Sequence, residues 1–491
     1  MSNIVKCSSD DFQHSEIAIV CDNGSHSLKA GFSNDNFPRS IIPTIVGRPK
    51  NEKISTVPKY REKLVFTSEA AIRNKDILDT ICPIRNSIIS DWDAMEKIWY
   101  HMYYEDLLVP PENYNILHTE VDMNLKSSRE KMFEIMFELF NVPKTAVIPK
   151  SVLALYGSGR TTGLMIDSGY DYTQVMPIFE GYPLHHAVQK MSVGGWHITQ
   201  YLIELLNKRG YSFNSSKDFE TINDIKEKLC YFALNFNFER DMYTEEKEKQ
   251  YILPDGMVIN VESEAFQSPE ILFDPLLFNI ESKLGGIHNL IHRACSACDY
   301  KEQKNMYNNI ILTGGNTMFE FLPIRLEKML ADLVTSSTSI QIQADPERKF
   351  STWLGGAILA SMPSYQQMWI SKKMYEEKGW AFGNDSIIEV KCPYLTKDYP
   401  TIEQAIKDKK LRIFKRNICH FIVYSHNWKH VEIIKYDPQF WFDKMESKLK
   451  RFYYECSLLE IVDLQFGKRF LTCDIMDPNY IITAQKSKIK K

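Results

Sequence analysis

The chain has 491 residues, which exceeds one ordinary hydrophobic core and predicts at least two lobes. Hydrophobic residues make up 44% and charged residues 25% of the sequence, as in a soluble globular protein. The formal net charge of −4 is close to neutral for this length and implies no general attraction to DNA or to a membrane. The polar start, residues 1–16, lacks the apolar segment of a signal peptide, and no window holds 18 uninterrupted apolar residues.

Two related strand-turn-strand patterns occur 145 residues apart, counted from Asp22 to Asp167. The apolar run Ile17–Cys21 predicts a buried strand, Asp22-Asn23-Gly24-Ser25 a tight turn, and Leu28–Phe32 the returning strand of a hairpin. Leu164–Ile166 followed by Asp167-Ser168-Gly169 repeats the pattern, with a return strand directly after it. Such a duplication predicts two related lobes that face each other across a cleft.

A third glycine turn, residues 312–317, follows the apolar run Asn309–Leu312 and precedes a helical pattern over Met318–Leu330. A strand, a glycine turn and a helix in this order direct backbone N–H groups toward an anion. One such turn is weak evidence, but three in one chain, each after a buried strand, favour phosphate binding.

Other segments are polar or change in character. The lysine-rich stretch Lys50–Asp79 predicts a mobile loop followed by a short element, and the charge run Glu239–Lys249 predicts a solvated loop. Glycines and polar residues near Trp380 predict a domain boundary.

The ten cysteines are scattered, which fits free thiols in a reducing compartment. Cys295 and Cys298 form a Cys-x-x-Cys pair with His292 nearby, but zinc needs four ligands and no second pair lies close by. A helix surface carrying two thiols is therefore preferred over a zinc site.

With these features in place, residues 16–380, nearly three quarters of the chain, resemble the actin and actin-related protein family. The matching segments are Val20–Ser25, Lys29–Phe32, Val46–Pro49, Asp91–Trp99, Arg129–Met132, Ser158–Gly163, Asp224–Tyr231, Pro346–Lys349 and Gln366–Lys372. The resemblance implies a two-lobed α/β ATPase fold around a cleft that holds ATP or ADP with Mg²⁺ or Ca²⁺. It assigns 16–150 and 350–380 to the first lobe and 151–349 to the second, after a flexible tail, 1–15.

The resemblance also implies the nucleotide-binding residues. They are Asp22, Gly24, Ser25, Lys29, Asp167, Ser168, Gly169, Gly195, Lys226, Glu227, Gly314, Gly315, Thr317, Met318 and Lys349. Backbone N–H groups and lysines would offset the phosphate charge, and the cation would be held through waters near Asp22 and Asp167, without direct protein ligands.

The sequence departs from the family where hydrolysis takes place. Lys150 replaces a glutamine, and a protonated lysine has three donors but no acceptor with which to orient the attacking water. Gln174 replaces a histidine, and Tyr170 and Asp171 change the second phosphate turn. His26 replaces a glycine in the first turn. We therefore expect nucleotide binding with slow or absent ATP hydrolysis and name no catalytic residue.

Surfaces that build filaments in the family have also changed. Residues 51–59 carry charges and a proline in place of small apolar residues, and Trp196 and His197 replace a charged pair. Leu276–Ile280, a second apolar plug of the family, is better preserved. The expected partners are actin, actin-related proteins and actin-binding proteins, with no membrane and no nucleic acid.

The segment 386–466 resembles the YqaJ-type viral recombinase exonuclease family. The matching residues are Ile388–Tyr394, His420–Tyr424, Asp437–Phe442, Phe452-Tyr453 and Leu458–Ile461. His420–Ser425 and Lys429–Tyr436 predict a β-hairpin within a small α/β appendage. The family's Glu-x-Lys pair is present as Glu389 and Lys391, but its upstream aspartate is missing, so nuclease activity is not expected. We interpret 381–466 as a partial nuclease fragment and 467–491 as a basic tail. The extension is either a true fusion or the product of two genes joined in the gene prediction.

The sequence is compatible with three functions. The preferred one is a divergent, cytoskeletal actin-family protein with a nucleotide in its cleft. The alternatives are a conventional filament-forming actin ATPase and a nucleic-acid-processing protein that uses its tail. Cytoplasm and cytoskeleton are the expected location, and the nucleus stays open.

Overall fold

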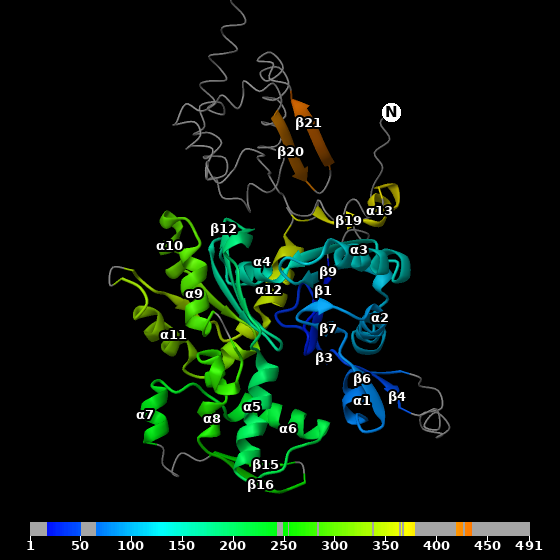
Figure 1. Cartoon of the computed structure of the whole chain (residues 1–491). Coiled ribbons are helices and arrows are strands. Elements are labelled where there is room, and N and C mark those ends of the chain that lie inside the picture. Colours follow the sequence, from blue (N-terminus) through cyan, green and yellow to red (C-terminus); the bar gives the residue numbers. More distant parts are fainter. Residues whose placement is uncertain are drawn as a thin grey trace, which may run out of the picture. The chain divides into compact units, whose positions relative to one another are not determined.

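The computed structural model describes residues 17–50, 65–242, 249–253, 255–281, 284–335, 338–362, 365 and 368–378, and the backbone of 419–425 and 428–434 (Figure 1). The chain divides into two compact units. The first consists of Met1–Pro143 and Val147–Ser361, and the second of Lys144–Ala146 and Met362–Lys491. None of the helices in the described ranges has the length and apolar character needed to cross a membrane.

The first unit contains a sheet built around one fully buried strand. The neighbouring strands, in spatial order, are β9 (Asn115–Glu120), β1 (Ala18–Asp22), β2 (Ser27–Phe32) and β3 (Ser40–Pro43). All residues of β1 are buried, and a continuous apolar run is typical of a strand covered on both faces. β1 pairs antiparallel with β2 and parallel with β9. The predicted first hairpin is confirmed, with bounds that differ by one residue.

The second sheet of this unit repeats that arrangement. Its members are β11 (Gly163–Ser168), β12 (Thr173–Phe179), β13 (Tyr182–Pro183), β14 (Gln189–Met191), β17 (Ile310–Thr313) and β18 (Ile342–Gln343). β11 pairs antiparallel with β12 and parallel with β17, as β1 does with β2 and β9. The predicted second hairpin is therefore confirmed too.

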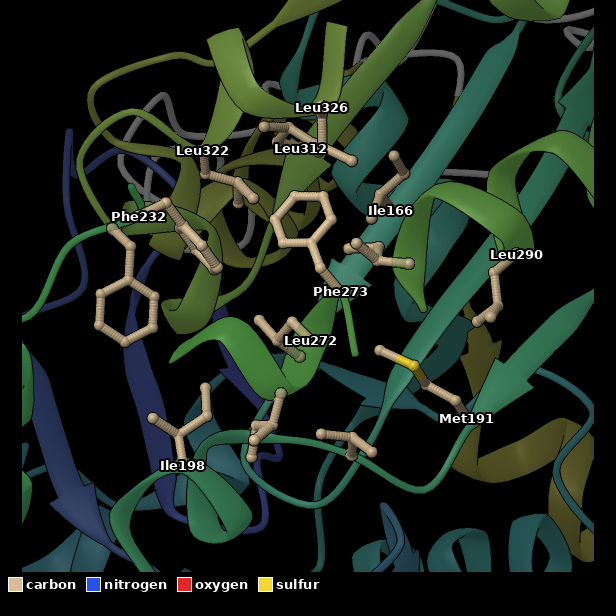
Figure 2. Packing of buried hydrophobic residues seen from close by; sticks show 14 of the residues in the cluster. Ile166, Met191, Ile198, Phe232, Leu272, Phe273, Leu290, Leu312, Leu322 and Leu326 are labelled. Atoms are coloured by element: carbon tan, nitrogen blue, oxygen red, sulfur yellow. The ribbon is translucent and has the colours of Figure 1, made fainter. Parts of the chain in front are cut away.

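The largest described core cluster packs helices against this second sheet. The main helices are α5 (Gly195–Lys208), α9 (Ile287–Ser296) and α11 (Leu322–Ala331). Figure 2 shows Leu322 and Leu326 of α11 near Leu312 of β17, and Leu290 of α9 in the same cluster. In α9 the buried residues recur at helical spacing, which explains why this segment forms a helix with one apolar face.

Two sequence-based expectations fail within this core. Cys295 and Cys298 are 0% and 5% exposed, so the thiols lie inside rather than on a helix surface. The Cys298 thiol donates to the carbonyl of Ala294, and no metal-binding cluster occurs among the described residues. The helix expected from Met318 begins only at Leu322, because a short 3₁₀ turn, Gly315–Met318, comes first.

The remaining elements of the first unit surround the sheets. The strands are β4 (Val46–Pro49), β5 (Phe66–Thr67), β6 (Leu78–Ile81), β7 (Ile84–Arg85), β8 (Ile88–Ile89), β15 (Lys249–Ile252) and β16 (Val258–Val261). The helices are α1 (Ser68–Arg73), α2 (Trp92–Tyr100), α3 (Lys126–Glu134), α4 (Lys150–Gly157), α6 (Ser216–Leu229), α7 (Phe236–Asp241), α8 (Glu264–Gln267), α10 (Tyr300–Tyr307) and α12 (Ser351–Ser361). The charge run Glu239–Lys249 is therefore not one loop, since its ends lie in α7 and β15, and 243–248 are outside the described residues.

Helices α4 and α12 pack directly against each other (Figure 1). A Cβ at Gly355 of α12 would overlap the carbonyl of Leu153 in α4, so only glycine allows this approach. The contact fixes α4, whose first residue is Lys150.

The second unit has four described elements besides the start of β10 (Lys144–Pro149). They are β19 (Ile370–Ser371), α13 (Lys372–Lys378) and the antiparallel pair β20 (Cys419–Ser425) and β21 (Trp428–Ile434). Lys144 and Thr145 of β10 pair with β19. The predicted β-hairpin is confirmed, whereas Glu389, Lys391 and the basic tail lie outside the described residues.

Candidate functional site

The three glycine turns predicted from the sequence line one cavity of the first unit. The cavity has a volume of about 720 Å³. Its wall includes Gly24 and Ser25 of the first turn, Gly169 of the second, and Gly314 and Gly315 of the third. The loops that were expected to face an anion therefore share one hollow, although they are far apart in the chain.

The first turn is fixed by Trp99 and by Thr119, of which the sequence analysis did not identify Thr119. The backbone N–H of Asn23 donates to Thr119 Oγ1 at 2.9 Å, and its side-chain amide donates to the Thr119 carbonyl at 3.0 Å. The indole of Trp99 donates to Asn23 Oδ1 at 3.1 Å. Thr119 lies on β9, so only the parallel pairing of β1 with β9 brings it to this turn.

The second and third turns are joined by Asn316, which the sequence analysis also missed. Its amide donates to the Gly169 carbonyl at 2.6 Å and to Ser168 Oγ at 3.1 Å. Gly314 has a φ of 90°, and a Cβ there would overlap the Ser168 carbonyl, so this position requires glycine. Ser168 and Thr317 are fully buried and therefore hold the turns rather than face the cavity.

Asp22 lies between two lysines at the end of β1. Lys29 Nζ is 3.3 Å from Asp22 Oδ2, and Lys150 Nζ is 3.5 Å from Asp22 Oδ1. Burial acts to raise the pKa of this carboxyl, but the ammonium groups of Lys150 and Lys29 outweigh it and lower the pKa to about 2. Asp22 is therefore ionised and held by cations.

Asp167, at the equivalent place of the second hairpin, has a pKa that is shifted in the opposite direction. Burial is the main cause that raises the pKa of this carboxyl to about 6, with Asp22 and Asp122 adding to the shift and Lys150 and Lys29 opposing it. None of the ion pairs found within the described ranges includes Asp167. The same local motif thus presents one paired and one unpaired carboxyl.

The two positions expected to weaken hydrolysis have different surroundings. Lys150 lines the cavity and donates to the Asn23 carbonyl at 2.5 Å. Gln174 is only 5% exposed, and its amide donates at 2.8 Å to Asp122 Oδ2, whose other oxygen accepts from Ser151. Gln174 therefore faces Asp122, a partly buried carboxyl. The position of Asp122 just beyond β9 is a signal that could have pointed to it.

The substituted residues of the first two turns make contacts along the cavity wall. The rings of His26 and Tyr170 stack with centroids 4.8 Å apart. Asp171 Oδ2 accepts a hydrogen bond from the backbone N–H of Asn86 at 2.6 Å, and this bond partly offsets the negative charge of the carboxylate. All three substituted side chains line the cavity.

Lys226 and Glu227, which the resemblance assigns to nucleotide binding, also line the cavity, but their polar groups have partners in the protein. Lys226 Nζ donates to the Gly195 carbonyl and to Asn223 Oδ1 at 3.1 and 2.7 Å. Burial lowers the pKa of Lys226 to about 8. Glu227 Oε1 accepts from the Asn223 amide at 3.0 Å. Met318 and Lys349 complete this part of the wall.

A comparison with known protein families matches residues 13–393 to the actin family. The chain therefore belongs to the actin family, and its two sheets with their helices form an α/β fold of that kind. The match extends beyond Trp380, where we expected the boundary, and includes Glu389 and Lys391. The resemblance of 386–466 to a nuclease family stays a prediction, as do the two lobe boundaries.

Actin-family folds generally bind ATP or ADP with a divalent cation. The residues here fit the nucleotide, because three turns and two lysines surround a hollow of suitable size. They do not fit the cation. Both oxygens of Asp22 already face ammonium groups, and a divalent cation about 4 Å from one ammonium is repelled by about 2 kcal/mol in bulk water and about 8 kcal/mol at an effective dielectric constant near 20.

Proposed function

We propose that the cavity binds ATP or ADP and hydrolyses ATP slowly or not at all, in a divergent member of the actin family with a cytoskeletal role. The observation that carries the proposal is the meeting of three glycine turns and two lysines around one cavity. Backbone N–H groups at such turns and lysine side chains are the groups that proteins use to hold phosphates.

Slow hydrolysis follows from the two substituted positions. An attacking water needs an acceptor that orients it or takes its proton. Lys150 offers only donors, and the amide of Gln174 is turned to Asp122. Neither side chain supplies that acceptor at the phosphate end of the cavity.

Two measurements on the purified full chain test these points. Chromatography of the supernatant after denaturation identifies any nucleotide that copurifies, and a phosphate-release assay gives the rate. We expect bound ATP or ADP and a rate at least about 100-fold below that of a conventional actin measured in parallel, the effect of losing one positioned catalytic group. The variant Lys150→Gln restores an acceptor and should raise the rate, whereas Lys150→Arg should not. A wild-type rate equal to that of the conventional actin would refute the slow-hydrolysis proposal.

We further infer that the protein joins assemblies of other actin-family proteins rather than forming filaments alone. The support is Leu276, in the second plug, which is 67% exposed and available to a partner. Residues 51–59 lie outside the described residues. Sedimentation of the purified chain, alone and mixed with a conventional actin, is the test. Cosedimentation only in the mixture is expected, and pelleting of the chain alone argues for the conventional filament instead.

A further inference from the structure

Lys150 is held in an unusual place for a cation. It is the first residue of α4, where the partial positive charge of the helix end disfavours an ammonium group. Its side chain is nevertheless only 11% exposed and reaches the first turn, where it donates to the Asn23 carbonyl and lies 3.5 Å from Asp22 Oδ1. The tight packing of α4 on α12 fixes this direction.

The oxygen atoms of the first turn that could hold a hydrated cation are already engaged. Asp22 Oδ1 accepts from Thr119 Oγ1 at 3.1 Å in addition to facing Lys150, and Asp22 Oδ2 accepts from Lys29 at 3.3 Å. The Asn23 carbonyl accepts from Lys150. Asp167 also lines the cavity, beside Gly314, and it is the carboxyl of the two hairpin turns that none of the ion pairs in the described ranges includes. Hard divalent cations need several such oxygens.

We propose that the ammonium group of Lys150 takes the place of the divalent cation, so that this site binds nucleoside di- and triphosphates without metal. The inference rests on the nucleotide binding proposed above. Of the three donors of the ammonium, one is used on the Asn23 carbonyl and one faces Asp22, and the third is left for a phosphate oxygen. Lys29 supplies the second positive charge from β2, on the other side of Asp22.

The test compares nucleotide affinity with and without metal. Full-length protein freed of bound nucleotide is titrated with ADP and with ATP, by calorimetry, in buffer with EDTA and in buffer with magnesium chloride. For the wild type we expect dissociation constants that differ by less than about threefold between the two buffers, because the charge-assisted contacts come from the protein.

Variants at one position separate the charge from the fold. Lys150→Gln should weaken binding in EDTA by about 10- to 100-fold, as expected for the loss of a hydrogen bond to a charged group, and magnesium should restore much of it. Lys150→Arg keeps the charge and should stay independent of metal. Lys208→Gln is the matched control. It removes the same charge from an exposed lysine of α5 that does not line the cavity. Circular dichroism confirms that each variant is folded.

The outcomes are distinct. Wild-type binding that falls at least about tenfold in EDTA overturns this inference while leaving the proposed nucleotide binding intact. Metal-independent binding that Lys150→Gln leaves unchanged in EDTA overturns the role of Lys150. Absence of ADP and ATP binding in both buffers overturns the proposed function, and this inference falls with it.

Discussion

The turns after β1 and β11 share a local sequence pattern and a backbone arrangement, yet the pKa values of their carboxyl groups are shifted in opposite directions. In the first hairpin Asp22 lies opposite Lys29, and in the second Asp167 lies opposite Gln174. Lys150 forms a second ion pair with Asp22, whereas none of the ion pairs in the described ranges includes Asp167. The pKa is lowered to about 2 at Asp22 and raised to about 6 at Asp167. A repeated motif therefore fixes where a carboxyl lies, and its neighbours in space set its pKa.

The largest effect should come from neutralising each carboxyl in turn. Asp22→Asn leaves Lys29 and Lys150 without their partner and should lower the free energy of unfolding by about 2–4 kcal/mol. Asp167→Asn removes an unpaired, poorly hydrated carboxylate and should raise it by about 1–2 kcal/mol at pH 7.5. Denaturant-induced unfolding of nucleotide-free protein measures both. If both variants changed the free energy of unfolding in the same direction, the proposed difference between the two carboxyl groups would be wrong.

The glycines of the two turns should respond differently to one added methyl group. A Cβ at Gly24 would overlap the Ser27 carbonyl, whereas at Gly169 the nearest atom, the Tyr172 carbonyl oxygen, is 3.8 Å away. We expect Gly24→Ala to lower the free energy of unfolding by about 1–3 kcal/mol. Gly169→Ala should change it by less than about 0.5 kcal/mol. The same unfolding assay applies, and equal losses would show that the second turn is as tight as the first.

The raised pKa of Asp167 predicts a definite pH dependence. A carboxyl whose folded-state pKa is raised from 3.8 to about 6 adds stability below its unfolded-state pKa, and this contribution is lost as the pH rises through about 6. The wild type should therefore gain about 1 kcal/mol relative to Asp167→Asn between pH 7.5 and pH 5. Subtracting the free energies of unfolding of the two proteins at each pH cancels the contributions of the other titrating groups. A constant difference would contradict the raised pKa.

The smallest effect concerns the contact that joins the two turns. The stacked rings of His26 and Tyr170 should be coupled by about 0.5–1.5 kcal/mol, the usual value for an aromatic pair. The single and double alanine variants form a mutant cycle that isolates this energy from the effects of each truncation. A coupling energy indistinguishable from zero would mean that the two turns are held together by other contacts.

Much of the cavity wall could be predicted from the sequence. Apolar runs that end in Asp and Gly identified both hairpins to within one or two residues, because buried strands and glycine turns depend on local pattern. The third turn was also predicted, but its helix began four residues later than expected, at Leu322, because the turn continues as a 3₁₀ segment. Thr119, Asp122 and Asn316 were missed, since each acts only through contacts distant in the chain.

The sequence by itself determined that the chain carries two copies of one strand-turn-strand pattern, a third glycine turn, and a lysine at position 150 where its family has a glutamine. Only the tertiary structure decided that this lysine reaches Asp22, 128 residues earlier in the chain, while Asp167 has no such partner among the described residues. The physical reason is that turns follow from short-range backbone preferences, whereas the charge state of a carboxyl depends on burial and on which cations the fold brings within a few ångströms.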